Sequence, residues 1–344
     1  MLDMEPKTEQ NKVILSTLPP LKDDTASKDL EIVEVWEDNF DEEMEKIQYL
    51  ISNYNCIAMD TEFPGVYYQG DHITGYNLIK TNVDGLKLIQ VGITLSDEKG
   101  NTPRPTSTWQ FNLRFDLTMD LYSQDSISML KEAGINFEEL SERGIDPTLF
   151  ADGFLSSGLI LNEDINWITF HGAFDFAYLI KVLSNSPLPN SLDKFKSCMK
   201  LYFPNVADIK VIMKEVHDLK MGALAKLARD LDLKRIGTMH QAGSDAEITS
   251  RCFFKIKDEY FKTGINPKLL NKVFGLAGEF QPPPSIPNQH TRPSALEIQK
   301  SNMYSQYPSQ PLGYYPYPGT EYQTGYYFNQ VELPMMYSPM PAQN

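Results

Sequence analysis

Residues 56–65, CIAMDTEFPG, carry the pattern from which the fold of this chain is predicted. Four apolar residues, 56–59, predict a short buried strand, and Asp60 and Glu62 follow at its end. In an extended chain residues i and i+2 project to the same side, so both carboxylates can reach one point beyond the strand. Taken alone, this pattern is equally typical of two solvated acids in a turn.

A further acidic residue follows a second apolar strand, which is predicted over residues 166–170. In FHGAFDFAYLI, residues 170–180, Asp175 stands where a helix is expected to begin. The exposed amides and the dipole of a helix N-terminus favour a carboxylate there. For Asp175 alone, this structural role is the better interpretation.

A third segment, RIGTMHQAGSDAEITSRCFFKI (residues 235–256), places His240 five residues before Asp245. Ser244 and Glu247 match a capping box, so we expect Ser244 to cap a helix over 245–261, with Asp245 in its first turn. Four acids and a histidine therefore stand in three separate segments, each at a strand end or a helix start. This arrangement is hard to produce by chance and predicts one shared site.

The order D-x-E, D, H-x4-D resembles the DEDD exonuclease superfamily in its His-bearing form. Longer runs narrow the resemblance to the Caf/Pop-type catalytic deadenylase subunits of the Ccr–Not complex, over about residues 31–279. These runs are MDTEFPG, LKLIQVGIT, STWQFN, FHGAFDFAYLIKVL and RIGTMHQAGSDAEIT. Two local departures are HGAFDF, where the family often has His-Ser-Gly-Tyr-Asp-Phe, and Thr238-Met239 beside His240. They could alter substrate fit, but no catalytic position is lost.

The resemblance implies a 3′→5′ poly(A)-specific exoribonuclease that releases 5′-AMP and acts in mRNA decay and translational repression. It implies two divalent ions, Mg²⁺ or Mn²⁺, which would offset the charge of the phosphodiester and of the leaving 3′-oxygen. It assigns Asp60, Glu62, Asp175 and Asp245 as metal ligands. It makes His240 the acceptor of the proton of the attacking water.

Two further residues are candidates for substrate binding. Phe63 adjoins Asp60 and Glu62 in sequence and could stack on an RNA base, although a core aromatic is as good an interpretation. His171 precedes Asp175 closely enough to line the same cleft, and a buried structural histidine is again equally favoured. The preference for poly(A) rests on the resemblance, because the spacing of the acids permits any single-stranded 3′ end.

Helical and strand periods alternate through the middle of the chain. Helices are expected over 41–54, 223–231 and 245–261, and strands over 56–59, 86–95, 107–113, 166–170 and 207–213, the last running into a helix. The order predicts an α/β fold, a ribonuclease H-like mixed sheet of five or six strands with helices on both faces. We expect this domain to span 30–279, after a disordered acidic arm, 1–29.

From residue 280 the composition changes. The segment 280–344 holds 12 of the 23 prolines and 9 of the 18 tyrosines, with many Gln and Ser residues, and we expect a disordered interaction tail. The net charge of −15 is concentrated in residues 1–45, which carry −10, so the predicted domain is only mildly acidic. It lacks the strong basic stripe of a protein that grips duplex nucleic acid by its phosphates.

Localisation and partners follow from weaker signals. Cys56, Cys198 and Cys252 are too widely spaced for a zinc site and are typical of reduced thiols in the cytoplasm or nucleus. No run of residues is apolar enough to predict a membrane helix. By resemblance, the partners are single-stranded RNA, a Not-type scaffold subunit and a leucine-rich-repeat deadenylase. The alternatives are a DEDD exonuclease without poly(A) preference and a subunit that mainly bridges the complex.

Overall fold

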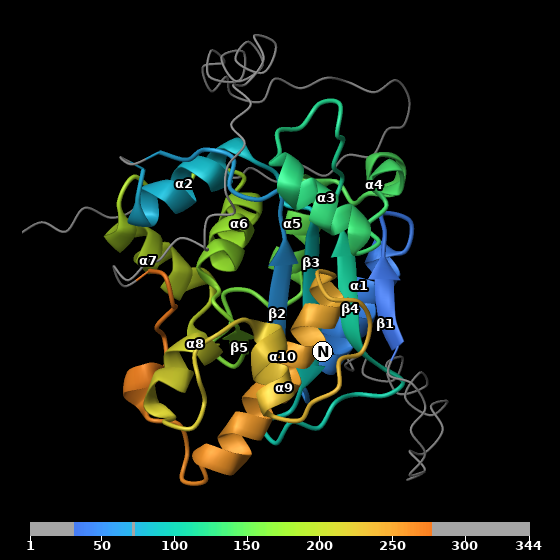
Figure 1. The fold of residues 1–344 in the computed structure, drawn as a ribbon. Helices are drawn as coiled ribbons and strands as arrows, with labels where there is room; N and C mark the ends of the chain where they lie inside the picture. The colour runs from blue at the N-terminus through green and yellow to red at the C-terminus, as the bar shows by residue number, and fades with distance from the viewer. Residues whose placement is uncertain (1–30, 71–72, 277–344) are drawn as a thin grey trace, which may run out of the picture. The chain divides into compact units, whose positions relative to one another are not determined.

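A computed structural model describes residues 31–70 and 73–276, which form one mixed sheet covered by helices (Figure 1). The sheet has six strands in the order β1-β4-β3-β2-β5-β6. β3 runs antiparallel to β2 and β4, and the other neighbouring pairs are parallel. The strands are β1 (Glu31–Val35), β2 (Cys56–Glu62), β3 (Gln90–Ser96), β4 (Thr106–Asn112), β5 (Asn166–Thr169) and β6 (Asn205–Asp208).

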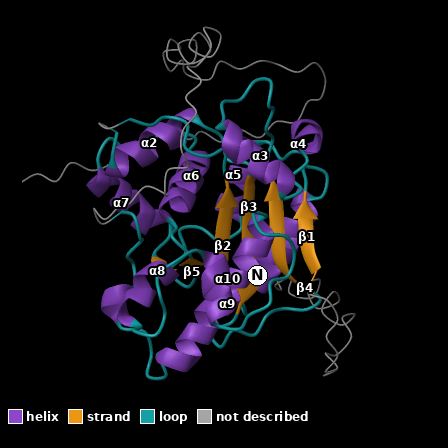
Figure 2. Cartoon of the chain, in the orientation of Figure 1, coloured by secondary structure: helices purple, strands orange, loops and turns teal. Residues whose placement is uncertain are grey.

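The described helices all follow β1 in the chain, between the later strands and after β6. Figure 2 shows them around the sheet. They are α1 (Phe40–Leu50), α2 (Gly75–Gly85), α3 (Gln124–Glu132), α4 (Phe137–Arg143), α5 (Pro147–Ser156), α6 (Ala173–Ser184), α7 (Leu192–Tyr202), α8 (Ile209–Ile212), η3 (Met213–Glu215), α9 (Leu224–Asp230), α10 (Ala242–Tyr260) and η4 (Pro267–Leu269).

The two faces of the sheet are covered by different helices. α10 crosses β2, β3 and β4 on one face, in front of the sheet in Figure 1. Along β2, Cys56 and Ala58 belong to the apolar cluster that includes Ile248 and Cys252 of α10. The alternate residues Ile57 and Met59 belong to the larger cluster formed with α1, α5 and α6. The alternation of a strand therefore separates two cores, one on each side of β2.

The predicted fold class, a mixed ribonuclease H-like sheet with helices on both faces, is confirmed, with six strands. The strand expected at 207–213 is wrong in extent, because β6 ends at Asp208 and Ile209 already begins α8. Asp208 causes this change, since its side chain accepts the backbone N–H of Lys210 (2.9 Å) and caps the short helix. The strand β1 was not expected.

The expected arm, 1–29, and the expected tail, 280–344, lie outside the described residues, so both boundaries of the domain stay predictions. Within the described ranges, none of the helices is long and apolar enough to cross a membrane. Cys56, Cys198 and Cys252 are all free thiols, as their spacing suggests.

Candidate active site

Asp60 and Glu62 lie within β2, which extends three residues beyond the predicted strand. Their positions pair with Gly92 and Gln90 of β3 in the middle of the sheet. Both belong to the same alternation as Ala58, so they point to the face that α10 covers. Glu62 is buried and Asp60 half-buried.

Asp175 lies in the first turn of α6, as expected, and is 7% exposed. Thr61, between the two acids of β2, donates its hydroxyl to Asp175 Oδ1 at 2.6 Å. This bond joins the start of α6 to the strand that carries Asp60 and Glu62. The second predicted segment is therefore held against the first.

Asp245 lies in the first turn of α10 and is also 7% exposed. Its Oδ2 accepts the backbone N–H of His240 at 2.8 Å, and its Oδ1 pairs with the guanidinium of Arg235 at 2.7 Å. One potential ligand atom from each of Glu62, His240 and Asp245 lies within 4.8 Å of the others. The structure thus brings the D-x-E segment and the H-x4-D segment together.

The expected cap of α10 is wrong. The helix begins at Ala242, so Ser244 lies inside its first turn rather than before it. The Ser244 hydroxyl donates to the carbonyl of Ile236 (2.6 Å), and Glu247 pairs with Arg251 (2.6 Å) instead of closing a capping box. Asp245 is nevertheless in the first turn because the helix starts only three residues earlier than predicted.

The carboxylates repel one another in a buried place. Burial, followed by the charges of Asp175, Asp245 and Glu62, raises the pKa of Asp60 well above its usual range. Burial and the charges of Asp245 and Asp175 do the same to the pKa of Glu62, and Arg235 opposes both shifts. Burial also raises the pKa of Asp175 to about 7, against the Thr61 hydrogen bond.

Such a set of oxygen donors fits hard divalent cations. Four carboxylates that destabilise one another as anions gain most from a bound cation, and Mg²⁺ and Mn²⁺ prefer oxygen ligands. Asp60, Glu62, Asp175 and Asp245 are the side chains that would hold these ions. His240 is close enough to Glu62 and Asp245 to be either a ligand or a neighbouring base.

Asp208 and Arg235 belong to the surroundings of the site but were not singled out from the sequence. Asp208 is fully buried and accepts four backbone N–H groups, those of His171 (3.1 Å), Gly172 (3.1 Å), Lys210 (2.9 Å) and Phe274 (3.0 Å). It therefore fixes the loop that leads into α6 and Asp175. An acid at the end of an apolar strand was the available signal for Asp208.

The two predicted substrate-binding residues are half-buried in protein contacts. The ring of Phe63 stacks on Phe174 and Tyr178 of α6, with centroids 5.2 and 4.9 Å away. His171 has a φ of 71° and meets Phe274 edge-on at 4.9 Å. Burial, then the charge of Lys210, lowers the pKa of His171 to about 4. A role in binding RNA stays a prediction for both residues.

Known proteins resemble this chain over the part that carries the site. A family model described as CAF1 family ribonuclease matches residues 35–147 and 158–253, which include all five predicted catalytic residues. The poly(A) ribonuclease pop2 of Schizosaccharomyces pombe is 45% identical over 251 residues, 71% of this chain and 75% of that protein. The probable CCR4-associated factor 1 homolog 7 of Arabidopsis thaliana is 44% identical over 271 residues, 75% of this chain and 96% of that protein.

Solved structures agree with this similarity. The Mg²⁺- and Mn²⁺-bound form of S. pombe Pop2p matches with a TM-score of 0.68 and 45% identity, covering 71% of this chain and 99% of that chain. A chain in the structure of the yeast NOT1 MIF4G domain co-crystallised with CAF1 matches with a TM-score of 0.65 and 31% identity, covering 75% of this chain and 99% of that one.

Proposed function

This chain belongs to the CAF1 family of ribonucleases, and we propose that it removes adenosines one at a time from the 3′ end of poly(A) tails. The observation that carries the proposal is the convergence of side chains from β2, α6, α10 and the loop before α10, namely Asp60, Glu62, Asp175, Asp245 and His240. The preference for poly(A) is supported by the relative named poly(A) ribonuclease at 45% identity.

The chemistry can be derived from the side chains of this chain. Asp60, Glu62, Asp175 and Asp245 would bind divalent cations, of the kind bound in the S. pombe Pop2p structure. Two such ions, when bound by these carboxylates, would supply positive charge to stabilise the phosphate and the leaving 3′-oxygen. His240 would accept the proton of the attacking water, and Asp245 holds the His240 backbone N–H and so fixes this loop. The product expected is a nucleoside 5′-monophosphate, 5′-AMP from poly(A).

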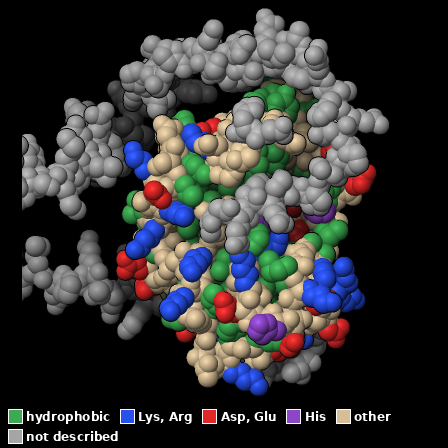
Figure 3. Space-filling model, turned by 60° about the vertical axis from the view of Figure 1, so that its left-hand side comes forward, with side chains coloured by type: hydrophobic (Ala, Val, Ile, Leu, Met, Phe, Trp, Pro, Cys, Tyr) green, Lys and Arg blue, Asp and Glu red, His purple; other side chains and the backbone are tan. Residues whose placement is uncertain are grey.

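The substrate is expected to be single-stranded and held over few nucleotides. On the face shown in Figure 3, Lys and Arg side chains are scattered among acidic and apolar ones and form no continuous stripe. A protein that tracks a long phosphate backbone usually presents such a stripe. Phe63 and His171 are proposed to contact the terminal nucleotides, because Phe63 directly follows Glu62 and His171 shortly precedes Asp175 in the chain.

We further propose that the chain works as a subunit of a Ccr4–Not complex in the cytoplasm and nucleus. A structurally similar chain was co-crystallised with the NOT1 MIF4G domain, which supports a Not-type scaffold as one partner. A leucine-rich-repeat deadenylase is proposed as the second partner from the family resemblance. The free thiols of Cys56, Cys198 and Cys252 suit a reducing compartment.

Labelled RNA tests the enzymatic proposal. The purified chain is incubated with Mg²⁺ and a 5′-labelled RNA in which mixed sequence is followed by adenosines. We expect a ladder that shortens from the 3′ end, releases 5′-AMP and slows at the mixed sequence, and chelation or Asp60→Asn should stop it. Equal rates through both parts would favour an exonuclease without poly(A) preference. No release by a folded wild-type chain would favour a bridging subunit.

A further inference from the structure

The first turn of α10 is capped by residues of the sheet rather than by its own N-cap residue. Gln241 occupies the N-cap position, and its side chain makes no capping bond. Instead the backbone N–H of Ala242 donates to Gln90 Oε1 (3.3 Å), and that of Gly243 donates to Gln110 Oε1 (2.8 Å). Two amide groups from β3 and β4 therefore satisfy N–H groups that a helix start leaves open.

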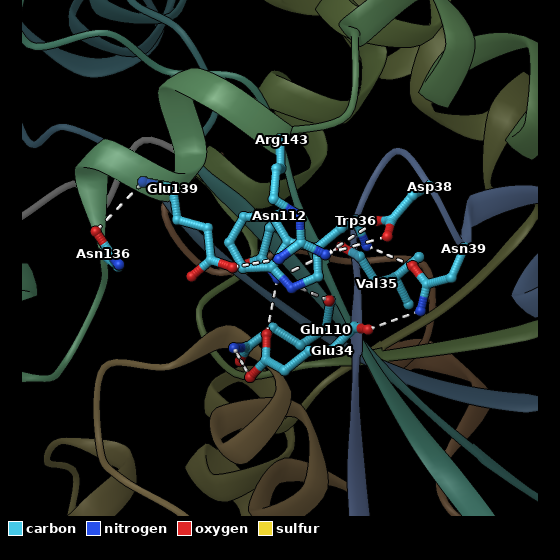
Figure 4. A network of polar contacts seen from close by, with 10 residues as sticks. All are labelled: Glu34, Val35, Trp36, Asp38, Asn39, Gln110, Asn112, Asn136, Glu139 and Arg143. Carbon is cyan, nitrogen blue, oxygen red and sulfur yellow. Dashed lines mark hydrogen bonds and ion pairs between the residues drawn. The ribbon is translucent and has the colours of Figure 1, made fainter.

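Further hydrogen bonds fix the orientation of these amides. Gln110 Nε2 donates to Glu34 Oε1 (2.9 Å) and to Gln241 Oε1 (2.8 Å). Asn112 Nδ2 donates to Glu34 Oε2 (2.7 Å), and Gln90 Nε2 donates to Asn112 Oδ1 (2.7 Å). Because a backbone N–H can only donate, each glutamine must turn its oxygen to α10 and its nitrogen to the network. Figure 4 shows Glu34 with the side chains of Gln110 and Asn112 directed to it.

The strand that carries Glu34 is itself anchored at its C-terminal end. The guanidinium of Arg143 lies over the ring of Trp36 at 5.2 Å and pairs with Asp38 (3.1 Å) and with Glu139 (Figure 4). The end of β1 is thereby tied to α4. The Glu34 carboxylate has a fixed position from which to hold the two amides of β4.

The capped end of α10 also has no room to move toward the sheet. A Cβ at Gly92 of β3 would lie 1.9 Å from the carbonyl oxygen of Ala242. A Cβ at Gly243 would lie 2.7 Å from Ile32 of β1. The helix start is therefore held by contact from β1 and β3 and by hydrogen bonds from β3 and β4.

We propose that Gln90, Gln110 and Glu34 are positioning residues, which cap α10 from the sheet and thereby set the geometry of His240 and Asp245. His240 directly precedes the N-cap residue and has a φ of 64°, a conformation that a residue with a side chain keeps only under constraint. Its N–H depends on the Asp245 carboxylate in the capped turn. The inference rests on the ribonuclease activity proposed above.

Gln110→Met tests the role of the cap, because methionine keeps the volume and removes both hydrogen-bonding groups. We expect kcat on RNA to fall about 10- to 100-fold, as for other residues that orient catalytic side chains, while KM changes little. Amide hydrogen exchange at Ala242 and Gly243 should become faster. Exchange does not depend on RNA cleavage, so it also tests the cap if the wild-type chain proves inactive.

Thr108→Val is the matched control. Thr108 lies on the same face of β4 as Gln110, is buried, and shares a 2.9 Å hydrogen bond with Thr94 of β3. Its loss should lower stability without lowering kcat, since the hydrogen bond of this pair does not involve the N–H groups of Ala242 and Gly243. If both variants lose kcat equally, the effect of Gln110 is general destabilisation and the proposal is wrong.

A charge swap separates hydrogen bonding from packing. Gln110→Glu alone places two carboxylates against each other and should lower kcat. The double variant E34Q/Q110E restores a donor at 34 and an acceptor for the Gly243 N–H, although Gln241 Oε1 still lacks the donor that Gln110 supplied. We expect the double variant to recover part of the lost kcat, to a value above that of Gln110→Glu alone. Failure of a folded double variant to recover activity would overturn the proposal.

Glu34→Ala covers the case in which changes at Gln110 prevent folding. Glu34 is exposed, so its truncation should leave the fold intact while both amides of β4 lose the Glu34 carboxylate as an acceptor. A fall in kcat together with faster exchange at Ala242 and Gly243 supports the cap. Unchanged kcat and unchanged exchange would overturn it.

Discussion

Asp175 couples the stability of the metal-free protein to pH. Burial raises its pKa from the ordinary value of 3.8 to about 7, the Thr61 hydrogen bond opposing the shift. Between about pH 4 and pH 7 the folded chain therefore keeps a proton at Asp175 that the unfolded chain has released. The free energy of unfolding falls as pH rises through this window, because the folded state binds more protons there.

Asp175→Asn should remove this dependence, since asparagine resembles the protonated acid and its oxygen can still accept the Thr61 hydroxyl. In chelator at pH 7.5 we expect the variant to be more stable than the wild type by a few kcal/mol, on the order of 1.4 kcal/mol for each unit of pKa shift. Near pH 4 the two proteins should melt together. Thermal denaturation across this range measures the difference. Asp193→Asn, a change at an exposed acid, is the control. If the difference in melting temperature between Asp175→Asn and the wild type did not change with pH, the raised pKa of Asp175 would be contradicted.

The geometry allows His240 to be either a base or a metal ligand, because one of its ring nitrogens lies within 4.8 Å of a carboxylate oxygen of Glu62 and of Asp245. If His240 is the base, His240→Ala should lower the rate of cleavage about 10²- to 10⁴-fold with little change in Mn²⁺ affinity. Single-turnover cleavage and calorimetric titration of Mn²⁺ measure the two quantities separately. A large loss of Mn²⁺ affinity would make His240 part of the metal site, and a normal rate would leave it a loop residue.

The start of α6 depends on one buried carboxylate in the next strand. Asp208 accepts N–H groups from His171 and Gly172 before α6, from Lys210 in α8, and from Phe274. Burial raises its pKa to about 6, so the carboxylate is ionised at neutral pH. The loop before Asp175 is thus organised by a residue of β6 rather than by its own sequence.

Asp208→Asn should destabilise the domain because the amide offers one acceptor and turns a donor toward donors. We expect a loss of about 2–4 kcal/mol in the free energy of unfolding, from several hydrogen bonds to a charged group. Urea denaturation at pH 7.5 measures it, and cleavage should slow as the start of α6 loosens. Asp146→Asn, which changes the exposed cap of α5, is the control and should cost little. Equal losses in the two variants would show that the four N–H bonds contribute little.

Short sequence patterns predicted the helices and strands that are determined mainly by their own residues. The apolar run before Asp60 gives β2, and helical spacing gives α10 to within three residues of its start. β1 was missed because EIVEV is only five residues long and lacks a clear period, and it gains its place by pairing with β4. The cap of α10 was mistaken because its acceptors, Gln90 and Gln110, lie far away in sequence.

The same distinction holds for the site. The five catalytic candidates were named because a D-x-E and an H-x4-D pattern are local and the resemblance ties them together. Asp208 was not named, since its role exists only after distant loops meet it. Arg235 was not named although Asp245 follows in the same segment, because a single arginine in a loop does not indicate its partner. Clustered carboxylates are therefore predictable from sequence here, but the residues that orient them are not.

Across the whole molecule, the similarity to known ribonucleases and the described structure cover the same central region. The matched ranges of the family model end at residue 253, and the described residues end at 276. The segment 280–344 differs in composition, with 12 of the chain's 23 prolines. Every residue of the candidate site lies before this segment.

Cutting the chain after Phe280 tests whether this central region suffices for folding and cleavage. The larger core cluster includes Val273 and Leu276, which lie near the C-terminal end of the described chain. A tail rich in Pro, Tyr and Gln adds few apolar groups that could extend this core. We therefore expect the melting temperature of the truncated chain to match that of the full chain, and its rate on poly(A) to stay within about twofold, the scatter expected where no site residue is lost.

A shorter chain, cut after Lys272, is the matched comparison, since it removes both core residues. It should melt several degrees lower, because about 2–5 kcal/mol of packing is lost for each large apolar side chain. If the cut after Phe280 lowers the melting temperature as much as the cut after Lys272, the tail packs on the domain and the predicted boundary is wrong.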